Sequence, residues 1–386
     1  MVTAVVVVAA GCTSPTGTGP PAMGAVQSTG PRASAVTVEV GWTTPTTSAV
    51  ADRPRPPTPV VLTRPSASAD SRGSPVPGAG TTGTQSTVTA NTSAHSLIAH
   101  LPPPASLVTP AAVAAPDEGS WKPFGPAVGG FQGAYSTLIR PDAVNTSTFD
   151  AVVWFDPTVL RLRQYPGMKV PGTPWDRPPY VEPERQTELV AAFSGGFRMQ
   201  DSHGGLILGT SVLRPMRSGA ATFAIDQNGT PNIGAWGTDI TDSPSLDSAR
   251  QNLDLIVIDG APVPGLATDP NKKWGATGPR NKPAVWRSGA GIRADGSIVW
   301  VGGDRLSVET LAETLVRAGA IRGMQLEINK PWVQLNAYAV DATGQVHGKQ
   351  LLAGMEHTGD RWLTQDDRDF IAVFIRTAPT GASSNA

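Results

Sequence analysis

The sequence predicts an α+β fold, in which one sheet-rich globular domain with a few packed helices follows a long disordered tether. Three observations predict it. From about residue 119 onward, short apolar runs recur between turn-forming residues, as they do in sheet proteins. One segment among them has the capped, amphipathic pattern of a helix. The region before them is dominated by Ser, Thr, Pro, Gly and Ala, with no sustained period of 2 or 3.6 residues.

The composition divides the chain into one folded region with flexible flanks. The 386 residues include 42 Gly and 37 Pro, unevenly spread, which favours one domain plus a tail over two domains. A segment rich in these residues cannot bury enough apolar surface to offset its conformational entropy. We therefore expect a signal peptide over residues 1–12, a disordered tether over 13–118, the globular domain over 119–378 and a disordered tail over 379–386.

The N-terminus has the pattern of a bacterial lipoprotein signal peptide. Val5-Val-Val-Val-Ala-Ala-Gly-Cys12 is a short apolar run that ends in small residues before the only cysteine. The run is far shorter than the roughly 20 apolar residues that span a bilayer. We expect export, with Cys12 lipidated after cleavage. The protein would then sit at the outer face of the cytoplasmic membrane or in the cell envelope, attached through its lipid anchor alone, or be secreted.

Charge and cysteine content exclude several classes of function. With 30 Lys+Arg against 31 Asp+Glu, the chain has no global field to attract nucleic acid, and we expect no nucleic-acid partner. A single cysteine excludes an intrachain disulfide and a cysteine-built metal site. His203 lies near a candidate motif but has no ligand spacing with the other histidines. The sequence identifies no cofactor, and a divalent metal ion on Asp-rich oxygen ligands stays open.

Strands are expected wherever an apolar run of strand length lies between turn residues. The runs are Ala151–Phe155, Leu189–Phe193, Ala221–Ile225, Leu253–Ile258, Gly289–Ile292, Ile298–Val301, Gly323–Ile328 and Phe370–Ile375. Asp226-Gln-Asn-Gly229 and Ala294-Asp-Gly296 predict hairpin turns, because Asn-Gly and Asp-Gly tolerate the positive φ of tight turns.

Two helices are expected. The clearer one covers Val308–Ala318, where apolar residues form one stripe. Ser307 can cap its N-terminus, and Gly319 can end it in the left-handed conformation. A second helix is expected around Glu184–Leu189.

Phe193-Ser-Gly-Gly-Phe197 is the first segment that suggests chemistry. Its strand ends in Ser194, Gly195 and Gly196 between two aromatic residues. Glycine has no Cβ, so backbone amides there can approach a ligand, and Ser194 offers a hydroxyl. A tight bend between packed strands explains the same residues equally well.

Arg287 and Asp259 are charged residues beside apolar strands. A guanidinium in such a place either pairs with a carboxylate, for which Asp259 and Glu327 are candidates, or holds an anionic oxygen of a ligand. Asp259-Gly260 follows an apolar strand and either presents a carboxylate at a sheet edge or simply forms a turn. Trp274 lies in the basic loop Asn271–Gly275, which is either functional or an ordinary surface loop.

The strand Met324–Asn329 alternates between apolar and polar residues. The period of two places Gln325, Glu327 and Asn329 on one face. This polar face either lines a cleft or is exposed to solvent. Lys330-Pro-Trp332 then turns the chain beside it.

In order, these segments resemble the phosphodiester glycosidase domain family, which includes the enzyme that uncovers mannose 6-phosphate on lysosomal proteins. Ser194-Gly-Gly-Phe197 is similar to the family's Asn-Gly-Gly-Phe-Phe, and Arg287-Ser-Gly289 before Asp295-Gly296 is similar to its next motif. The Leu-rich helix and Gly319-Ala320 also fit. The final family motif, Leu-Asp-Gly-Gly-Gly-Ser, reads here Leu326-Glu-Ile-Asn-Lys-Pro-Trp332, so Glu replaces Asp and the glycine-serine cradle is absent. The chain is thus similar to a divergent bacterial member.

The resemblance implies a hydrolase that cleaves a sugar-1-phosphodiester or related glycosidic bond in an envelope glycan. In that hypothesis Arg287 holds the phosphate, the Gly195 and Gly196 amides support it, and Glu327 and Asp259 divide the acid and base roles. The substrate-binding residues would further include Ser194, Asn329, Trp332 and Trp274, with a Trp stacking on a sugar ring. The altered final motif keeps a second hypothesis open, a non-catalytic glycan-binding module on the same fold.

Overall fold

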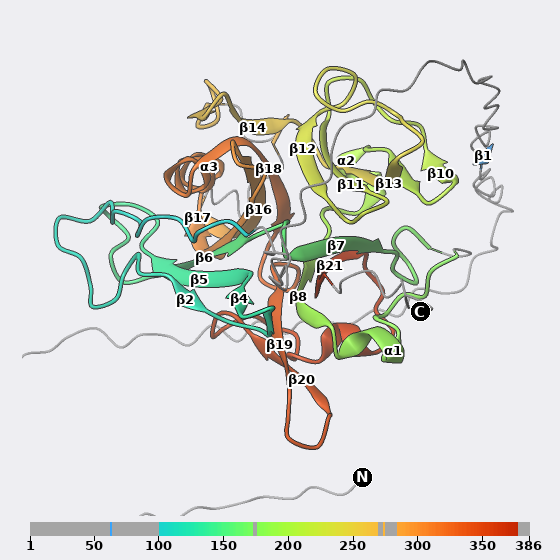
Figure 1. Ribbon diagram of the computed structural model, residues 1–386. Helices are drawn as coiled ribbons and strands as arrows, with labels where there is room; N and C mark the ends of the chain where they lie inside the picture. Colours follow the sequence, from blue (N-terminus) through green and yellow to red (C-terminus); the bar gives the residue numbers. More distant parts are fainter. Residues whose placement is uncertain (1–61, 64–99, 173–175, 269–272, 275–283, 377–386) are drawn as a thin grey trace, which may run out of the picture. The chain divides into compact units, whose positions relative to one another are not determined.

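The computed structural model describes residues 62–63, 100–172, 176–268, 273–274 and 284–376, all in one compact unit (Figure 1). The predicted α+β, sheet-rich fold class is confirmed. The predicted signal peptide with Cys12, most of the tether and the tail over 379–386 lie outside the described residues.

The sheet that carries Glu327 is antiparallel and joins distant parts of the chain. Its strand order is β15 (Ala261–Pro262), β14 (Leu255–Ile258), β18 (Ala320–Ile328), β16 (Val285–Arg293), β17 (Ile298–Leu306), β6 (Asp150–Phe155), β5 (Ala134–Ile139) and β2 (Lys122–Pro123). The expected hairpin turn between β16 and β17 is confirmed, with Gly296 at φ +83°.

A second sheet carries the Gly195–Gly196 motif. Its order is β20 (Val346–Gln350), β19 (Leu335–Val340), β8 (Leu189–Ser194), β21 (Phe370–Ile375) and β7 (Leu160–Tyr165). Because β8 and β21 are antiparallel and Ser194 lies opposite Phe370, the residues after β8 meet those before β21. This pairing positions the site described below.

A third sheet completes the domain. Its order is β1 (Leu62–Thr63), β10 (Ser211–Arg214), β9 (Leu206–Leu208), β13 (Leu246–Gln251), β11 (Ala221–Asp226) and β12 (Pro231–Ala235), and β3 (Ala127–Val128) pairs separately with β4 (Phe131–Gln132). The expected turn at 226–229 joins β11 to β12, with Gly229 at φ +77°. Each predicted strand run forms a strand, but the run Leu253–Ile258 does so only from Leu255, because Leu253 adopts φ +62°.

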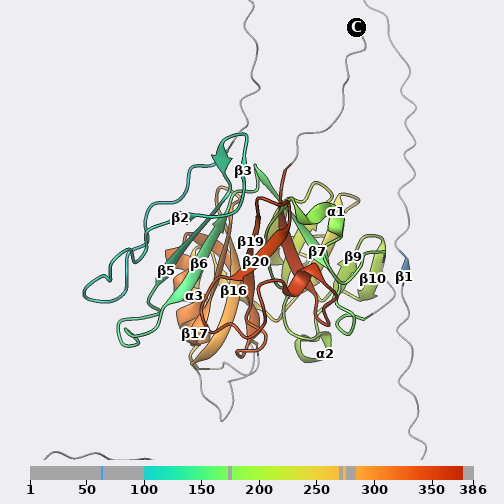
Figure 2. The ribbon, with the colours of Figure 1, turned by 90° about the horizontal axis from the view of Figure 1, so that it is seen from below.

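The helices of the described residues are α1 (Pro183–Gln186), α2 (Met199–Ser202), α3 (Val308–Arg317) and the 3-10 turn Arg361–Leu363. The expected α3 is confirmed, and it packs against β14, β16, β17 and β18. Figure 2 shows it beside β16 and β17. The second expected helix is wrong in extent: α1 ends at Gln186, and Leu189 already belongs to β8, because its side chain is buried in the sheet's core. Within the described residues, no helix has the length and apolar character to cross a membrane.

The three sheets share one apolar core, and aromatic rings mark the place where they meet. Phe193 of β8 lies 6.4 Å from the ring of Phe155 in β6 and 6.3 Å from that of Phe223 in β11, measured between ring centroids. All three side chains are buried, and burial of such a side chain contributes on the order of 2 kcal/mol. Phe193 thereby fixes the backbone directly before Ser194-Gly195-Gly196.

The described domain extends further toward the N-terminus than the predicted boundary at residue 119. Leu107 is buried in the cluster that contains the α3 residues, and its amide donates to the Gly119 carbonyl (2.9 Å). Glu118 is also buried, where it accepts hydrogen bonds from Thr109 and Arg140. Residues 100–118 therefore pack on the domain, although their composition resembles that of the tether, because a few apolar and charged contacts fix them.

Replacing Ser307 by alanine is expected to destabilise the domain by about 1 kcal/mol. The Ser307 hydroxyl accepts from the Thr310 amide (3.0 Å), and Thr310 in return accepts from the Ser307 amide (2.9 Å), which forms a capping box. The free energy of unfolding from a urea titration tests this expectation. A Ser218→Ala variant, which removes an exposed hydroxyl outside any helix end, controls for loss of a hydroxyl. An unchanged midpoint for Ser307→Ala would show that the cap contributes nothing.

Candidate functional site

Three strand ends bring charged and glycine residues together. Gly195 and Gly196 follow β8, Arg368 and Asp369 precede β21, and Glu327 lies near the end of β18. Asn252, which follows β13, connects them: its Nδ2 donates to the Gln325 (2.7 Å) and Leu326 (3.0 Å) carbonyls, and its Oδ1 accepts from the Phe197 amide (3.3 Å). One buried side chain thus joins the β18 end to the glycine turn.

Glu327 is the titratable group at the centre of this arrangement. Its side chain is 4% exposed, and Oε1 accepts from Arg368 Nη2 at 2.6 Å. Burial raises the pKa of Glu327 to about 8; Arg368 and Arg250 oppose the shift, and Asp369 adds to it. The carboxyl is therefore mainly protonated at neutral pH, when it can donate a proton.

Three contacts hold Arg368 in place beside Glu327. Besides Glu327, its Nη2 donates to the Gly196 carbonyl at 2.8 Å, and the guanidinium lies 4.6 Å from the centroid of the Trp332 ring. Its Nε is buried and has no hydrogen-bond partner among the described residues. Contacts with an acid, a carbonyl and an aromatic face fix the guanidinium plane.

A second buried ion pair supports the glycine turn. Arg250 Nε donates to Asp369 Oδ2 at 3.0 Å, with both side chains 0% exposed, and Gln164 Nε2 donates to the same oxygen at 3.1 Å. A Cβ on Gly195 would lie 2.5 Å from Asp369 Oδ2, and one on Gly196, at φ +143°, would lie 3.1 Å from Arg250 Nη1. Both glycines are therefore required by close packing against this pair.

The same packing limits which amides a ligand can reach. The Gly195 amide donates to the Asp369 carbonyl at 3.0 Å, so it is already used within the protein, contrary to the sequence hypothesis. Within the part of the chain that the structure describes, the Gly196 amide has no acceptor. Ser194 is buried at the end of β8 and its amide donates to the Gln334 carbonyl.

The polar face of β18 is buried and not exposed to solvent. Gln325 is 0% exposed and its Oε1 accepts from Arg287 Nη1 at 2.8 Å. Arg287 is also 0% exposed and donates from Nε to the Leu306 carbonyl (3.0 Å); burial lowers its pKa to about 10. Glu327 pairs with Arg368, so the alternative in which Arg287 pairs with Glu327 is not the one that the structure shows. A fully buried guanidinium also cannot contact a surface ligand directly.

The turn after β18 places polar and aromatic side chains at the rim. Asn329 adopts φ +73°, and its Oδ1 is buried with no partner among the described residues. Trp332 is 36% exposed above Arg368, and its ring lies 6.4 Å from that of His357. His357 Nε2 in turn lies 2.9 Å from the Pro331 carbonyl. Trp332 is thus partly exposed to solvent next to Arg368, the arginine that binds Glu327.

Asp259 and Trp274 do not belong to this arrangement. Asp259, at φ +50°, is exposed in the hairpin turn between β14 and β15, and the next amide donates to the Ile321 carbonyl. Ile321 therefore marks the point of β18 that is nearest to this turn. Glu327 lies six residues after Ile321 on the same strand, which places it roughly 20 Å from Asp259. Trp274 is 5% exposed, packs in the α3 cluster and donates to the Leu255 carbonyl (3.2 Å). Turn chemistry and core packing explain these two residues.

The sequence reasoning missed Arg368, Asp369, Arg250 and Asn252. One signal could have found the first two: Asp366-Asp-Arg-Asp369 is a charged run directly before the apolar strand β21. Arg250 and Asn252 gave no such signal, because β13 reads as a polar strand although its last residues are buried.

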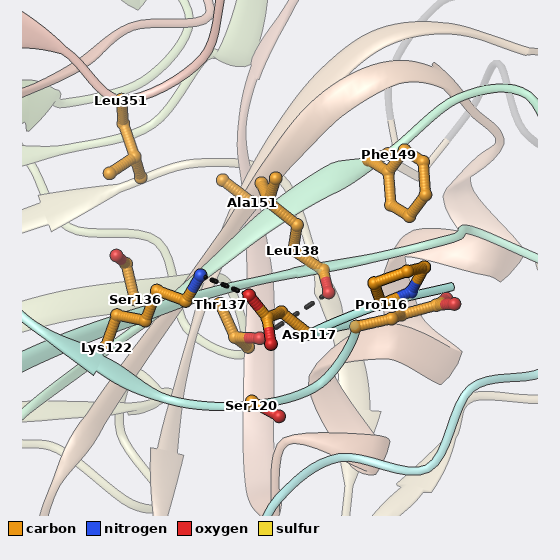
Figure 3. A pocket seen from close by; sticks show the side chains of 11 residues that line it. Pro116, Asp117, Ser120, Lys122, Ser136, Thr137, Leu138, Phe149, Ala151 and Leu351 are labelled. Atoms are coloured by element: carbon orange, nitrogen blue, oxygen red, sulfur yellow. Dashed lines mark hydrogen bonds and ion pairs between the residues drawn. The ribbon is translucent and has the colours of Figure 1, made fainter. Parts of the chain in front are cut away.

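A cavity of about 480 Å³ lies elsewhere, on the β5 side of the Glu327 sheet (Figure 3). β5 is four strand positions from β18, roughly 19 Å away. The charged pair on its wall, Lys122 and Asp117, is exposed and mutually neutralising. Among the described residues, no group of three or more His, Cys, Asp or Glu side chains is arranged to hold a metal ion. The Glu327 arrangement therefore remains the candidate site.

No protein-family model matches the chain, and no curated protein sequence matches it significantly. Some solved structures show a distant likeness to it. The zebrafish N-acetylglucosamine-1-phosphodiester alpha-N-acetylglucosaminidase catalytic domain, auto-inhibited by its pro-peptide, matches at 14% identity and TM-score 0.43, over 66% of this chain and 87% of that chain. A hypothetical protein from Synechocystis matches at 12% and 0.34, over 67% and 65%. A presumed exported protein from Burkholderia pseudomallei matches at 13% and 0.34, over 59% and 74%. Such likenesses are distant and carry no information about activity.

Proposed function

We propose that this protein is a hydrolase of a sugar-1-phosphodiester or related glycosidic bond, with Glu327 as its general acid. The observation that carries the proposal is the buried Glu327 carboxyl, whose pKa is raised to about 8 while Arg368 holds one of its oxygens. A general acid works best when its pKa lies near the working pH, because it is then protonated yet still donates readily. Protonation of the leaving oxygen by Glu327 would make the bond easier to break.

The neighbouring groups supply orientation and binding in this proposal. Arg368 positions the acid, and the exposed face of Trp332 offers a stacking surface for a sugar ring. Asn329 Oδ1 and the Gly196 amide have no partner among the described residues, but both lie buried, so we give them no direct contact with the substrate. Asp369 is engaged with Arg250 and Gln164, so we give it a positioning role. The motif resemblance at Ser194–Phe197 and Arg287–Gly289 supports the same reaction class.

An envelope glycan is the proposed substrate, reached through export and lipid attachment at Cys12. This part of the proposal rests on the apolar run and small residues before that cysteine. A Cys12→Ser variant that still fractionated with membranes would contradict it.

The full-length protein tests the reaction directly. Incubation with phosphodiester-linked glycans is expected to release a free sugar and a phosphomonoester, which chromatography and phosphate assay detect. A protein that binds these glycans and releases neither product would refute the hydrolase proposal.

The rate is expected to fall as pH rises through about 8. Glu327 acts in its protonated form, and the protonated fraction declines above its pKa, about tenfold for each further pH unit. The measurement is kcat/KM against pH from 6 to 10 on a substrate that does not titrate in that range. A flat profile across pH 8 would contradict the assignment of Glu327 as the acid.

One observation favours a second candidate, a glycan-binding module without catalysis. Asp259, the second carboxylate of the sequence hypothesis, is roughly 20 Å from Glu327, whereas the Trp332 face suits sugar stacking without chemistry. The two functions separate in the product assay, because a binding module retains the glycan and releases nothing.

A further inference from the structure

A cavity of about 230 Å³ lies beside the glycine turn and is distinct from the Glu327 carboxyl itself. Three cationic side chains line it, those of Lys169, Arg198 and Arg214. No carboxylate is among the described residues that line it. A small hollow with this lining is suited to an anion.

The cavity is connected to the candidate site through Arg368. Arg198 comes two residues after Gly196, whose carbonyl accepts from Arg368. On the other wall, Val170 forms a β-bridge with Arg368. The pKa of Arg198 is raised, mainly by its hydrogen bond with Asp201 and to a smaller extent by the charge of Glu327. Arg198 and Glu327 are therefore within electrostatic reach of each other. Arg368 therefore connects the wall of this cavity to the Glu327 carboxyl.

The cations can turn toward a ligand at little cost. Lys169 pairs with Asp367 at 2.7 Å with side chains 75% and 53% exposed, and Arg198 pairs with Asp201 at 2.7 Å with side chains 51% and 44% exposed. Exposed pairs of this kind contribute little to stability, because solvent screens them. Arg214 donates to the Met199 carbonyl (2.8 Å), and no carboxylate of the described residues pairs with it.

We propose that this cavity is an anion subsite that binds the phosphoryl oxygens of the substrate, with Arg214 as its central residue. The proposal rests on the proposed hydrolase function, and it moves phosphate recognition from the buried Arg287 to an accessible surface. The planar guanidinium of Arg214 can donate to two phosphoryl oxygens at once, and Arg198 and Lys169, which also line the cavity, add positive charge.

Calorimetric titration of the full-length protein with inorganic phosphate tests the subsite. Arg214→Gln is expected to weaken phosphate binding about tenfold or more, since it removes a charge-assisted bond. Arg317→Gln is the matched control: this half-buried arginine also donates to one carbonyl, that of Val108, but lies on α3. Arg198→Gln, at an exposed side chain, is expected to weaken binding in the same direction and covers the case in which Arg214→Gln misfolds.

The outcomes separate this subsite from the hydrolase function. Phosphate binding that is lost in Arg214→Gln but kept in Glu327→Gln supports the subsite, even if the wild-type protein hydrolyses nothing. Normal hydrolysis combined with an unchanged KM and unchanged phosphate inhibition in Arg214→Gln overturns the subsite and leaves the function standing. Wild-type protein that binds no phosphate, or phosphate binding that Arg214→Gln and the control Arg317→Gln weaken equally, also overturns it.

Discussion

Glu327→Gln is expected to lower kcat by about 10² to 10⁴-fold while the domain stays folded. Glutamine has the shape of a protonated glutamate and can still accept from Arg368, so the contacts around position 327 persist. It cannot deliver a proton, so the leaving oxygen departs without acid assistance. The measurement is turnover of a phosphodiester-linked glycan beside the binding constant for the same glycan, which should change little.

Glu309→Gln provides the control for this substitution, because Glu309 is exposed on α3 and touches no part of the site. It should leave turnover unchanged. Full activity in Glu327→Gln would refute the general-acid role, whereas loss of folding would show that Glu327 is mainly a structural partner of Arg368.

The same variant is expected to change how stability depends on pH. The pKa of Glu327 in the folded protein, about 8, lies above its ordinary value of 4.5. Folding therefore favours the protonated form of Glu327. The contribution of this group to the free energy of unfolding is fully present below about pH 4.5. It is lost as pH rises toward 8, by up to about 1.4 kcal/mol per pH unit. Urea titrations between pH 5 and 8 should show a smaller decline for Glu327→Gln than for the wild-type protein.

Local pattern was sufficient to predict much of the fold. The runs that became β6, β8, β18 and β21 are apolar over strand length, so burial and chain geometry both favour a strand there. Ser307 and Gly319 predict helix ends from their own chemistry, because serine caps N-termini and glycine adopts the left-handed conformation after C-termini. α3 begins directly after Ser307 and ends shortly before Gly319. Its buried stripe follows from a period of 3.6.

The site was predicted in part, because it depends on pairing between distant segments. Glu327, the two glycines, Asn329 and Trp332 do come together, since each stands at the end of a strand or in the turn after it. Arg368 reaches Glu327 only because β21 pairs with β8 in one particular register, which no local pattern encodes. Asp259 shows the opposite case: an Asp-Gly pair fits a two-residue hairpin turn so well that the turn alone explains it.

Buried charge is the other property that the sequence conceals. Arg250 and Asp369 read as surface residues by type, yet both are completely buried, because each satisfies the other and Gln164 and the Phe197 carbonyl complete the set. The site is therefore built on an internal ion pair whose strength can be measured.

Asp369→Asn is expected to lower the free energy of unfolding by about 3 kcal/mol or more. The substitution keeps the shape of the side chain but removes the charge that faces Arg250, and it leaves a cation 0% exposed without a carboxylate. Asp367→Asn is the matched control two residues away, because Asp367 pairs with Lys169 at the surface; it should cost about 0–1 kcal/mol. Urea titrations of both variants at pH 7 measure the difference.

The alkaline limb of activity gives the Asp369→Asn prediction a second readout that general destabilisation would not move. Asp369 contributes to the raised pKa of Glu327, so removal of its charge should lower that pKa and shift the decline in kcat/KM to lower pH. Asp367→Asn should leave the limb in place. Equal stability losses in the two variants would mean that burial does not set the strength of the Arg250–Asp369 pair. An unchanged alkaline decline of kcat/KM in Asp369→Asn would mean that this pair does not influence the pKa of Glu327.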